Sequence, residues 1–248
     1  MLIYLKQMIM NNLTILYKSI KYNFLIYLRI KQAVFFTTFF PVFLFVIFGN
    51  IWGKSPDYIP FILTGLIGMT IASEGIFSIG SVISLYYTSG LIKYFKKLPF
   101  KSILHFLGLI ISRIFSLFLT ILILCLISFL VFDYLPSIFR ILNYLLATIV
   151  GLTIFSFIGL SISFSNTKEG IEKGLSNLIY FIIIFTSMAF YPIKYFNKTF
   201  GEIGDYLPLN NILNLLRGDD INYYVLLFWL VIPILIFLYF FNRIKSTR

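Results

Sequence analysis

The sequence predicts an all-α, polytopic membrane protein with six transmembrane helices and an amphipathic helix before the first of them. Three observations carry this prediction. Hydrophobic residues make up 60% of the 248 residues, charged residues only 12%, and the mean hydropathy is +0.96. A soluble domain of this length cannot bury so much apolar surface. The apolar residues gather in runs of about 20, the length that crosses a bilayer, and most lysines and arginines lie between these runs.

The apolar runs define the expected spans. They are 33–52, 58–85, 103–132, 141–164, 175–196 and 222–241. We therefore expect a single transmembrane domain over 1–248, with its spans between 33 and 241. Pro192 interrupts the fifth run, so a count of five spans stays open if that segment is re-entrant.

The distribution of lysine and arginine predicts which segments face the cytoplasm, because positive charges are retained there in short loops. With the N-terminus inside, the cytoplasmic segments hold Lys6, Lys18, Lys21, Arg29, Lys31, Lys93, Lys96, Lys97, Lys101, Lys168, Lys173, Arg243, Lys245 and Arg248. The external segments hold only Lys54, Arg140, Lys194, Lys198 and Arg217. Both termini are therefore expected in the cytoplasm and the loop 197–221 outside. The same distribution explains the net charge of +11 without a nucleic-acid partner.

Residues 1–32 have the pattern of an amphipathic helix. The apolar residues Leu5, Ile9, Leu13, Leu16 and Ile20 fall at helical spacing on one stripe. Lysine, glutamine, asparagine and threonine gather on another face. We expect this helix to lie in the cytoplasmic interface of the membrane. A simple positive-inside anchor is the alternative.

The sequence offers little for catalysis, metal binding or nucleotide binding. One cysteine, Cys125, and one histidine, His105, argue against a His/Cys zinc site. The stretch "GNIWGKS", residues 49–55, resembles a phosphate-binding loop, but it has three residues between its glycines where the motif needs four. It would also face the outside, away from ATP. We expect no catalytic residue, bound cofactor or metal in this chain.

Two charged residues lie inside expected spans, Glu74 in the second and Arg113 in the third. An unpaired charge is costly in a bilayer, so such residues indicate an ion pair or a functional site. Each stands eleven residues from the cytoplasmic end of its span, at Leu85 and Ser102 respectively. At about 1.5 Å per residue, both would lie about 16 Å from that edge. Neighbouring antiparallel spans would bring them together, either to fix helix packing or to line a translocation route.

The stretch "SGLIKYFKKLPFKS", residues 89–102, joins the second and third spans and interleaves lysines with aromatic residues. These are Lys93, Lys96, Lys97 and Lys101 among Tyr94, Phe95 and Phe100. Such a pattern fits nucleic acid, a lipid surface or a docking site for a protein. Its place between two strongly apolar runs favours the last two.

Three blocks of the sequence, taken in order, carry a family resemblance. After the second span come Gly90-Leu91-Ile92-Lys93 and then Leu98-Pro99. Further on stands "IGLSISFSNTKEGIEKGLSNLIYFIIIFTSMAFYPIKYF", and then "YLPLNNILNLLRG" before the last span. Together they resemble the membrane (permease) subunits of ABC exporters of the type-2 permease family, ABC-2. The chain departs from the family's pattern where Tyr86 and Tyr87 replace a frequent Glu-Arg, and at Glu74, in a span that is normally uncharged.

The resemblance implies a function and a set of partners. The chain would be the permease subunit of an ATP-driven exporter and not itself an enzyme, with ATP and Mg²⁺ bound by a separate ABC ATPase subunit. Two permease subunits, identical or related, would pair in a bacterial cytoplasmic membrane. The bias toward Ile, Phe, Lys, Asn and Tyr is also typical of AT-rich bacterial genomes. The cargo would be an amphipathic or antimicrobial peptide first and a hydrophobic drug second.

The resemblance also implies a role for the loop 86–104. In the family, the first cytoplasmic loop forms a short coupling helix that presses into a groove of the ATPase subunit. The residues implied here are Gly90, Ile92, Lys93, Tyr94, Phe95, Lys96, Lys97, Leu98 and Pro99. The lysines would face acidic ATPase residues or lipid headgroups. An ion-coupled transporter, a stand-alone membrane immunity protein and a membrane enzyme are the alternative functions.

Overall fold

The computed structural model of the chain describes residues 2–55, 57–90, 102–165 and 171–246. Within these ranges it contains helices and no strand. The sequence prediction of an all-α, polytopic fold is therefore confirmed.

The helices follow the apolar runs closely. The first part of the chain forms α1 (Leu2–Arg29), α2 (Lys31–Val34), the π-helical turn η1 (Phe35–Phe39) and α3 (Phe40–Trp52). The next part forms α4 (Tyr58–Ser73), the π-helical segment η2 (Glu74–Gly80), α5 (Ser81–Thr88) and α7 (Ser102–Phe132). The last part forms α8 (Ile138–Ser163), α9 (Ile171–Phe185), α10 (Ile193–Phe196), α11 (Lys198–Tyr206), α12 (Pro208–Arg217) and α13 (Tyr223–Ser246).

Local sequence explains several helix ends. The side chains of Ser137 and Asn197 accept hydrogen bonds from the backbone N–H groups three residues on, and so cap the N-termini of α8 and α11. Pro208 stands at the start of α12, where its missing N–H costs nothing. Gly218 ends α12 in the left-handed conformation (φ 74°) that glycine adopts without strain.

Five helices of the described residues are long and apolar enough to cross a membrane: Phe35–Trp52, Tyr58–Tyr86, Leu107–Phe132, Ile138–Ser163 and Tyr223–Asn242. The expected span 175–196 differs. There, α9 has 15 residues and ends at Phe185, so it is only about 22 Å long. By helix length, the described part of the chain agrees with the alternative count of five.

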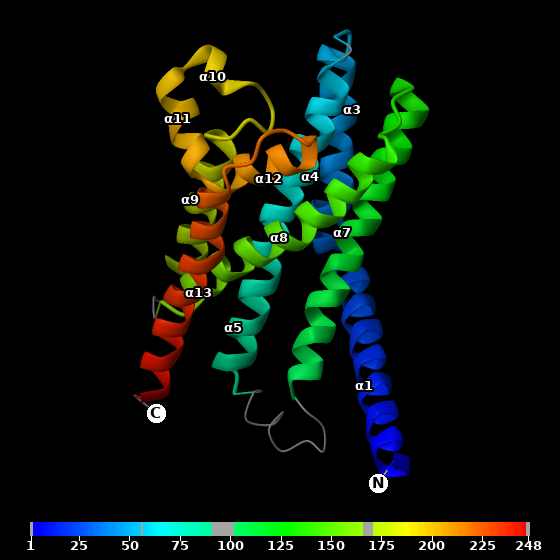
Figure 1. Cartoon of the computed structure of the whole chain (residues 1–248), viewed down its shortest axis with the longest axis vertical. Helices are drawn as coiled ribbons and strands as arrows, with labels where there is room; N and C mark the ends of the chain where they lie inside the picture. The colour runs from blue at the N-terminus through cyan, green and yellow to red at the C-terminus, as the bar shows by residue number, and fades with distance from the viewer. Residues whose placement is uncertain (1, 56, 91–101, 166–170, 247–248) are drawn as a thin grey trace.

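Figure 1 shows how the helices run between the two ends of the bundle. The N-terminus and C-terminus lie at one end of the bundle, together with the end of α5 at Thr88 and the start of α7 at Ser102. We call this the terminal end. The connection between α3 and α4 lies at the opposite end, as do α10, α11 and α12. Because α8 descends toward the terminal end and α13 does so again, the short α9 returns the chain between them.

The centre of the bundle is α4 with η2, packed against α3, α7, α8 and α12. Twelve residues of α4 are buried, from Ile59 to Ala72. Glycines let η2 and α8 approach backbone to backbone, because a Cβ atom on Gly159 would lie 2.5 Å from the carbonyl oxygen of Ile76. Small residues of this kind allow close helix packing in a membrane, where dispersion contacts replace the hydrophobic effect.

The helix α1 packs along the first half of α7 (Figure 1). Its buried side chains there are Ser19, Asn23 and Tyr27, and the ring of Phe24 meets that of Phe115 edge to face at 5.5 Å. Leu13, from the predicted apolar stripe, is 60% exposed. An exposed apolar residue on this helix suits a membrane interface, and the interfacial location stays a prediction.

The segment 197–221, expected as an external loop, is folded into α11 and the buried helix α12. Leu209, Ile212, Leu213 and Leu216 are fully buried, because α12 packs into the bundle against α4 and α8. The apolar spacing of "LPLNNILNLL" builds an amphipathic helix whose stripe enters the core. The external location of the segment stays a prediction.

Candidate functional site

The two charges inside the spans meet in the structure. Glu74 is the first residue of η2, and Arg113 lies in α7. The Arg113 guanidinium donates a hydrogen bond from Nη1 to Oε1 of Glu74 at 3.1 Å. The two residues are 6% and 2% exposed. A carboxylate and a guanidinium so enclosed each provide the countercharge that the other needs away from water.

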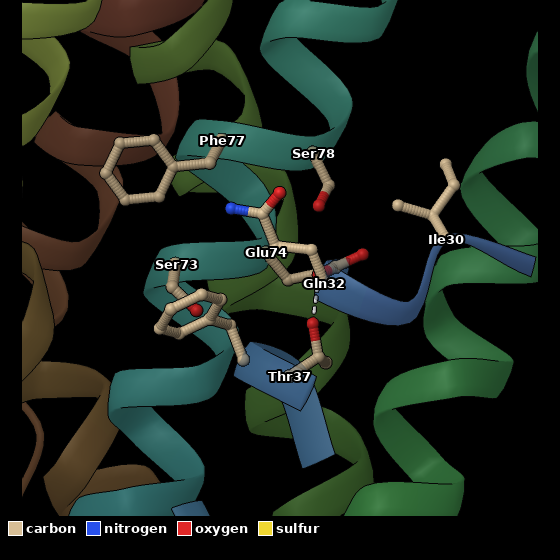
Figure 2. A pocket seen from close by; sticks show the side chains of 8 residues that line it. Ile30, Gln32, Thr37, Ser73, Glu74, Phe77 and Ser78 are labelled. Carbon is tan, nitrogen blue, oxygen red and sulfur yellow. Dashed lines mark hydrogen bonds between the residues drawn. The ribbon is translucent and has the colours of Figure 1, made fainter. Parts of the chain in front are cut away.

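Two further elements complete this charged site. Thr37, in the π-helical turn η1, donates a hydrogen bond from Oγ1 to Oε2 of Glu74 at 3.2 Å (Figure 2). The Arg113 guanidinium lies over the ring of Tyr27, in α1, at 5.1 Å from its centroid. Both carboxylate oxygens of Glu74 are thus bonded, and the charge of Arg113 also faces an aromatic ring. The pair ties α1, η1, η2 and α7 together.

The depth of the pair follows from the helix ends opposite the terminal end. Glu74 stands sixteen residues after Tyr58 and Arg113 nineteen residues before Phe132. At about 1.5 Å per residue these positions lie about 24 Å and about 28 Å from the opposite end. Glu74 and Arg113 therefore each lie in the half of their helix that is nearer the terminal end. Their depth of about 16 Å below the cytoplasmic edge stays a prediction.

The predicted coupling loop joins α5 to α7 at the terminal end (Figure 1). Gly90 has φ 74°, and nothing lies within 4 Å of where a Cβ would stand. The other predicted coupling residues lie outside the described residues: Ile92, Lys93, Tyr94, Phe95, Lys96, Lys97, Leu98 and Pro99. Glu74 and Arg113 lie on the helices that lead into and out of this loop.

An apolar cavity of about 540 Å³ lies among η2, α5, α7, α8 and α13. Isoleucine, leucine and phenylalanine side chains form most of its wall, including Ile114, Phe157 and Phe237. The hydroxyl groups of Thr153 and Ser156 donate to carbonyl groups of α8 itself. The cavity therefore presents apolar surface, which suits an acyl chain or apolar side chains.

Sequence reasoning missed the contacts of a second arginine, the half-buried Arg217 at the end of α12. Its guanidinium donates to Oγ1 of Thr64 at 3.0 Å and to the carbonyl oxygens of Met188 at 2.7 Å and Phe61 at 3.4 Å. It also lies 4.1 Å from the centroid of the Phe61 ring. Burial lowers the pKa of Arg217 to about 10, although Asp219 opposes this effect, so the residue stays charged at neutral pH. The arginine in "LLRG" was counted only as an external charge.

In the part of the chain that the structure describes, little supports a metal site or a catalytic histidine. No three His, Cys, Asp or Glu residues there come close enough together to hold a metal ion. His105 packs against α1, with Nδ1 at 3.2 Å from Oγ of Ser19. Burial lowers the pKa of His105, which favours its neutral form. Its surroundings are those of a helix-packing residue.

A family model described as ABC-2 type transporter matches residues 16–219. The match covers the charged site, the loop at the terminal end and α12 with Arg217. No curated protein matches the chain.

Proposed function

The chain belongs to the ABC-2 type transporter family, and on that premise we propose that it is the permease subunit of an exporter driven by a separate ABC ATPase subunit. The family match over residues 16–219 is the observation that carries this proposal. The chain is a multi-pass membrane protein and the membrane component of an ABC transporter. The ATPase partner, outward transport, the cargo and the bacterial cytoplasmic membrane with both termini inside belong to the proposal.

The ATPase subunit would dock on the loop 86–104. The end of α5 and the start of α7, which flank this loop, lie at the same end as both termini (Figure 1), and the segments expected at that end are the richest in lysine and arginine. Tyr94, Phe95 and Phe100 would fill an apolar groove of the ATPase, since aromatic anchors dominate such interfaces. The surrounding lysines would face acidic residues or anionic lipid headgroups.

The charged site supports a mechanism for coupling. A push on the loop reaches η2 through α5, and it reaches α7 directly. Because Arg113 binds Glu74 at 3.1 Å, these two helices would move as one unit. The close backbone contact of η2 with Gly159 would then pass the movement to α8. We propose that the ion pair makes the two arms of the loop rigid rather than taking part in chemistry.

The opposite end would carry the outer gate of the route. There α12 is buried against α4 and α8, and Arg217 binds backbone oxygens of α4 and of the turn after α9. A second permease subunit, identical or related, would complete the route between the two subunits. The exposed aromatic residues Phe35, Phe36, Phe39 and Phe43 suit such a partner or lipid.

The cargo class is proposed as an amphipathic or antimicrobial peptide first and a hydrophobic drug second. The apolar cavity of about 540 Å³ supports an apolar portion in the cargo. A stand-alone immunity protein or an ion-coupled transporter would need no ATPase partner, so the same experiment separates these functions.

The test combines co-purification with a change in the loop. We expect an ABC ATPase to co-purify with the wild-type chain from native membranes. The double change Tyr94→Ala/Phe95→Ala should uncouple ATP hydrolysis from transport while leaving the protein in the membrane. The matched control is Tyr223→Ala/Tyr224→Ala, which removes two exposed tyrosines at the opposite end and should leave coupling intact.

Two results would contradict the proposal. Absence of any ATPase from the purified wild-type chain would favour the alternatives. Full cargo-stimulated ATP hydrolysis and transport in Tyr94→Ala/Phe95→Ala would mean that docking does not use these aromatic residues.

A further inference from the structure

A small pocket opens beside the charged site, at the break between α1 and α2. Its volume is about 270 Å³. Figure 2 shows Gln32, Thr37 and Ser78 around Glu74, with Phe77 on one side and Ile30 on the other. The pocket is formed by residues 30–37, which lead into the first span, and by residues 73–78 at the end of α4 and in η2. It is separate from the apolar cavity, with which it shares no lining residue.

The wall of the pocket holds one carboxylate, Glu74, whose charge is paired with Arg113 outside the wall. Among the described residues that line it, Glu74 alone is charged, and Arg113 is not part of the wall. An ionised carboxylate can accept about four hydrogen bonds. Arg113 and Thr37 supply one each in the structure. Glu74 can therefore accept a further donor from the pocket without losing its partner.

The remaining wall suits a positive group with an apolar tail. Phe36 and Phe77 line the pocket, and aromatic faces attract ammonium and guanidinium groups. Gln32, Ser73 and Ser78 add polar groups. At the mouth, Phe36 is 55% exposed and Ile30 47% exposed. An apolar chain can therefore lie across the mouth while a polar head enters.

The position of the pocket at the start of the first span indicates where a ligand would come from. The pocket lies at the start of the helix Phe35–Trp52, which is long and apolar enough to cross a membrane, and its lining residues Ile30 and Gln32 stand just before that start. In a membrane, this end of the span would meet the headgroups of the leaflet on the terminal side. An amphiphile inserted in that leaflet holds its charged head at this level and its tail in the core. It can reach the mouth sideways, without passing through water.

We propose that this pocket binds the cationic head of an amphiphile that approaches from the leaflet on the terminal side. A primary ammonium or a lysine side chain of an amphipathic peptide has the required chemistry. An anionic head would meet the Glu74 carboxylate, and a neutral head would forgo the charge-assisted hydrogen bond. The identification of this ligand with the exported cargo rests on the proposed function. Binding of the ligand to the pocket is independent of that function.

The binding test uses the whole chain in nanodiscs, without ATPase. The probes are dodecylamine with a fluorophore at the far end of its chain and the matching labelled dodecanol, each corrected for partition into empty nanodiscs. The wild type should bind the amine about tenfold more tightly than the alcohol, the scale of one charge-assisted hydrogen bond. Equal affinities for the two probes would overturn the proposal.

A tethered competitor tests the location. Gln32 is exposed and lines the pocket, so Gln32→Lys adds an ammonium beside Glu74 without disturbing the core. It should weaken binding of the amine about tenfold and leave binding of the alcohol unchanged. The control Asn50→Lys makes the same charge change at the exposed opposite end of α3. If Asn50→Lys weakens amine binding as much as Gln32→Lys, net charge and not the pocket is responsible.

A second variant removes the carboxylate without leaving a lone charge. Glu74→Gln/Arg113→Leu should bind amine and alcohol equally, provided that it elutes as a single folded species. Retained preference for the amine would overturn the role of Glu74. If amine binding behaves as proposed but no ATPase co-purifies, the proposed function fails while this site stands. If the ATPase co-purifies but the chain binds amine and alcohol equally, the proposed site fails while the proposed function stands.

Discussion

Each end of the bundle holds an arginine packed between helices, Arg113 buried and Arg217 half-buried, and the two find their hydrogen-bond partners in different ways. Toward the terminal end, Arg113 binds the carboxylate of Glu74 at 3.1 Å. At the opposite end, Arg217 binds a hydroxyl group and two backbone carbonyl groups. Among the described residues no carboxylate forms an ion pair with Arg217.

The difference reflects which hydrogen-bond acceptors the surrounding helices leave free at each arginine. Around Arg113 the helices are continuous, so their carbonyl groups are used within the helix and a charged partner must come from a side chain. Around Arg217 the chain is broken. The helix α9 ends at Phe185, and the turn after it leaves backbone groups that must find partners away from water. Arg217 takes the carbonyl oxygen of Met188, while Asn210 accepts from the N–H of the same residue.

The comparison teaches that the two arginines have different roles. Arg113 neutralises an acidic residue and joins two arms of one loop. Arg217 donates hydrogen bonds to the carbonyl group of Met188, in the turn after α9, and to that of Phe61, in α4, and so holds α12 in the bundle. A change at the first arginine leaves a lone charge, whereas a change at the second leaves the carbonyl group of Met188 without its donor.

The largest effect is expected from breaking the ion pair. Arg113→Leu leaves the Glu74 carboxylate buried without its countercharge. Glu74→Gln leaves the Arg113 guanidinium buried without its countercharge. Loss of one partner from a buried pair costs about 3–5 kcal/mol. Each single variant should therefore give a much lower yield of folded protein, measured by size-exclusion chromatography in detergent. The double variant Glu74→Gln/Arg113→Leu should recover most of this yield, because no lone charge remains.

Two results would decide what the ion pair does. If the double variant recovers the yield but not transport, the pair serves coupling as well as packing. Single losses that simply add, with no recovery in the double variant, would contradict a direct pairing. The control is Lys198→Ala, because Lys198 and Glu202 form an exposed pair at 3.9 Å. Exposed pairs contribute little, so the yield should not change.

A smaller effect is expected at the opposite end. Arg217→Met keeps much of the side-chain volume but removes all three hydrogen bonds. No lone charge remains, and the cost is that of the unpaired carbonyl oxygen of Met188, about 1–3 kcal/mol, because the carbonyl oxygen of Phe61 still accepts from Oγ1 of Thr64 at 2.8 Å. We expect a lower unfolding temperature and faster protease cleavage in the segment 186–207, with α12 less firmly held. A loss of folded yield as severe as that of Arg113→Leu would contradict the distinction between the two arginines.

The sequence predicts the terminal end better than the opposite end. Five of the spans follow from apolar runs, since a lipid-facing helix must be apolar along its length. The contact of Glu74 with Arg113 could be expected because two costly charges stood at equal distances from one loop. In contrast, Thr37 and Tyr27 gave no signal, because a threonine and a tyrosine before or within an apolar run are unremarkable.

At the opposite end, local pattern and tertiary contact diverge. "YLPLNNILNLLRG" is polar enough to suggest a loop, yet its leucines form a buried stripe only when α4 and α8 are present. The end of α9 at Phe185 precedes Pro192 by several residues, so proline does not mark the break. The partners of Arg217 are backbone oxygens, which no side-chain pattern reveals.

We propose that the terminal end faces the cytoplasm and receives an ATPase on the loop 86–104. Labelling of single cysteines with a membrane-impermeant maleimide tests it most directly. The background is Cys125→Ser, since Cys125 is the only native cysteine, and the two reporters are Lys96→Cys in the loop and Glu202→Cys at the opposite end. We predict that Lys96→Cys is labelled only in inverted vesicles and is protected when the ATPase subunit is bound, whereas Glu202→Cys is labelled only in intact cells. Labelling of Lys96→Cys from outside, or undiminished labelling with the ATPase bound, would contradict the account.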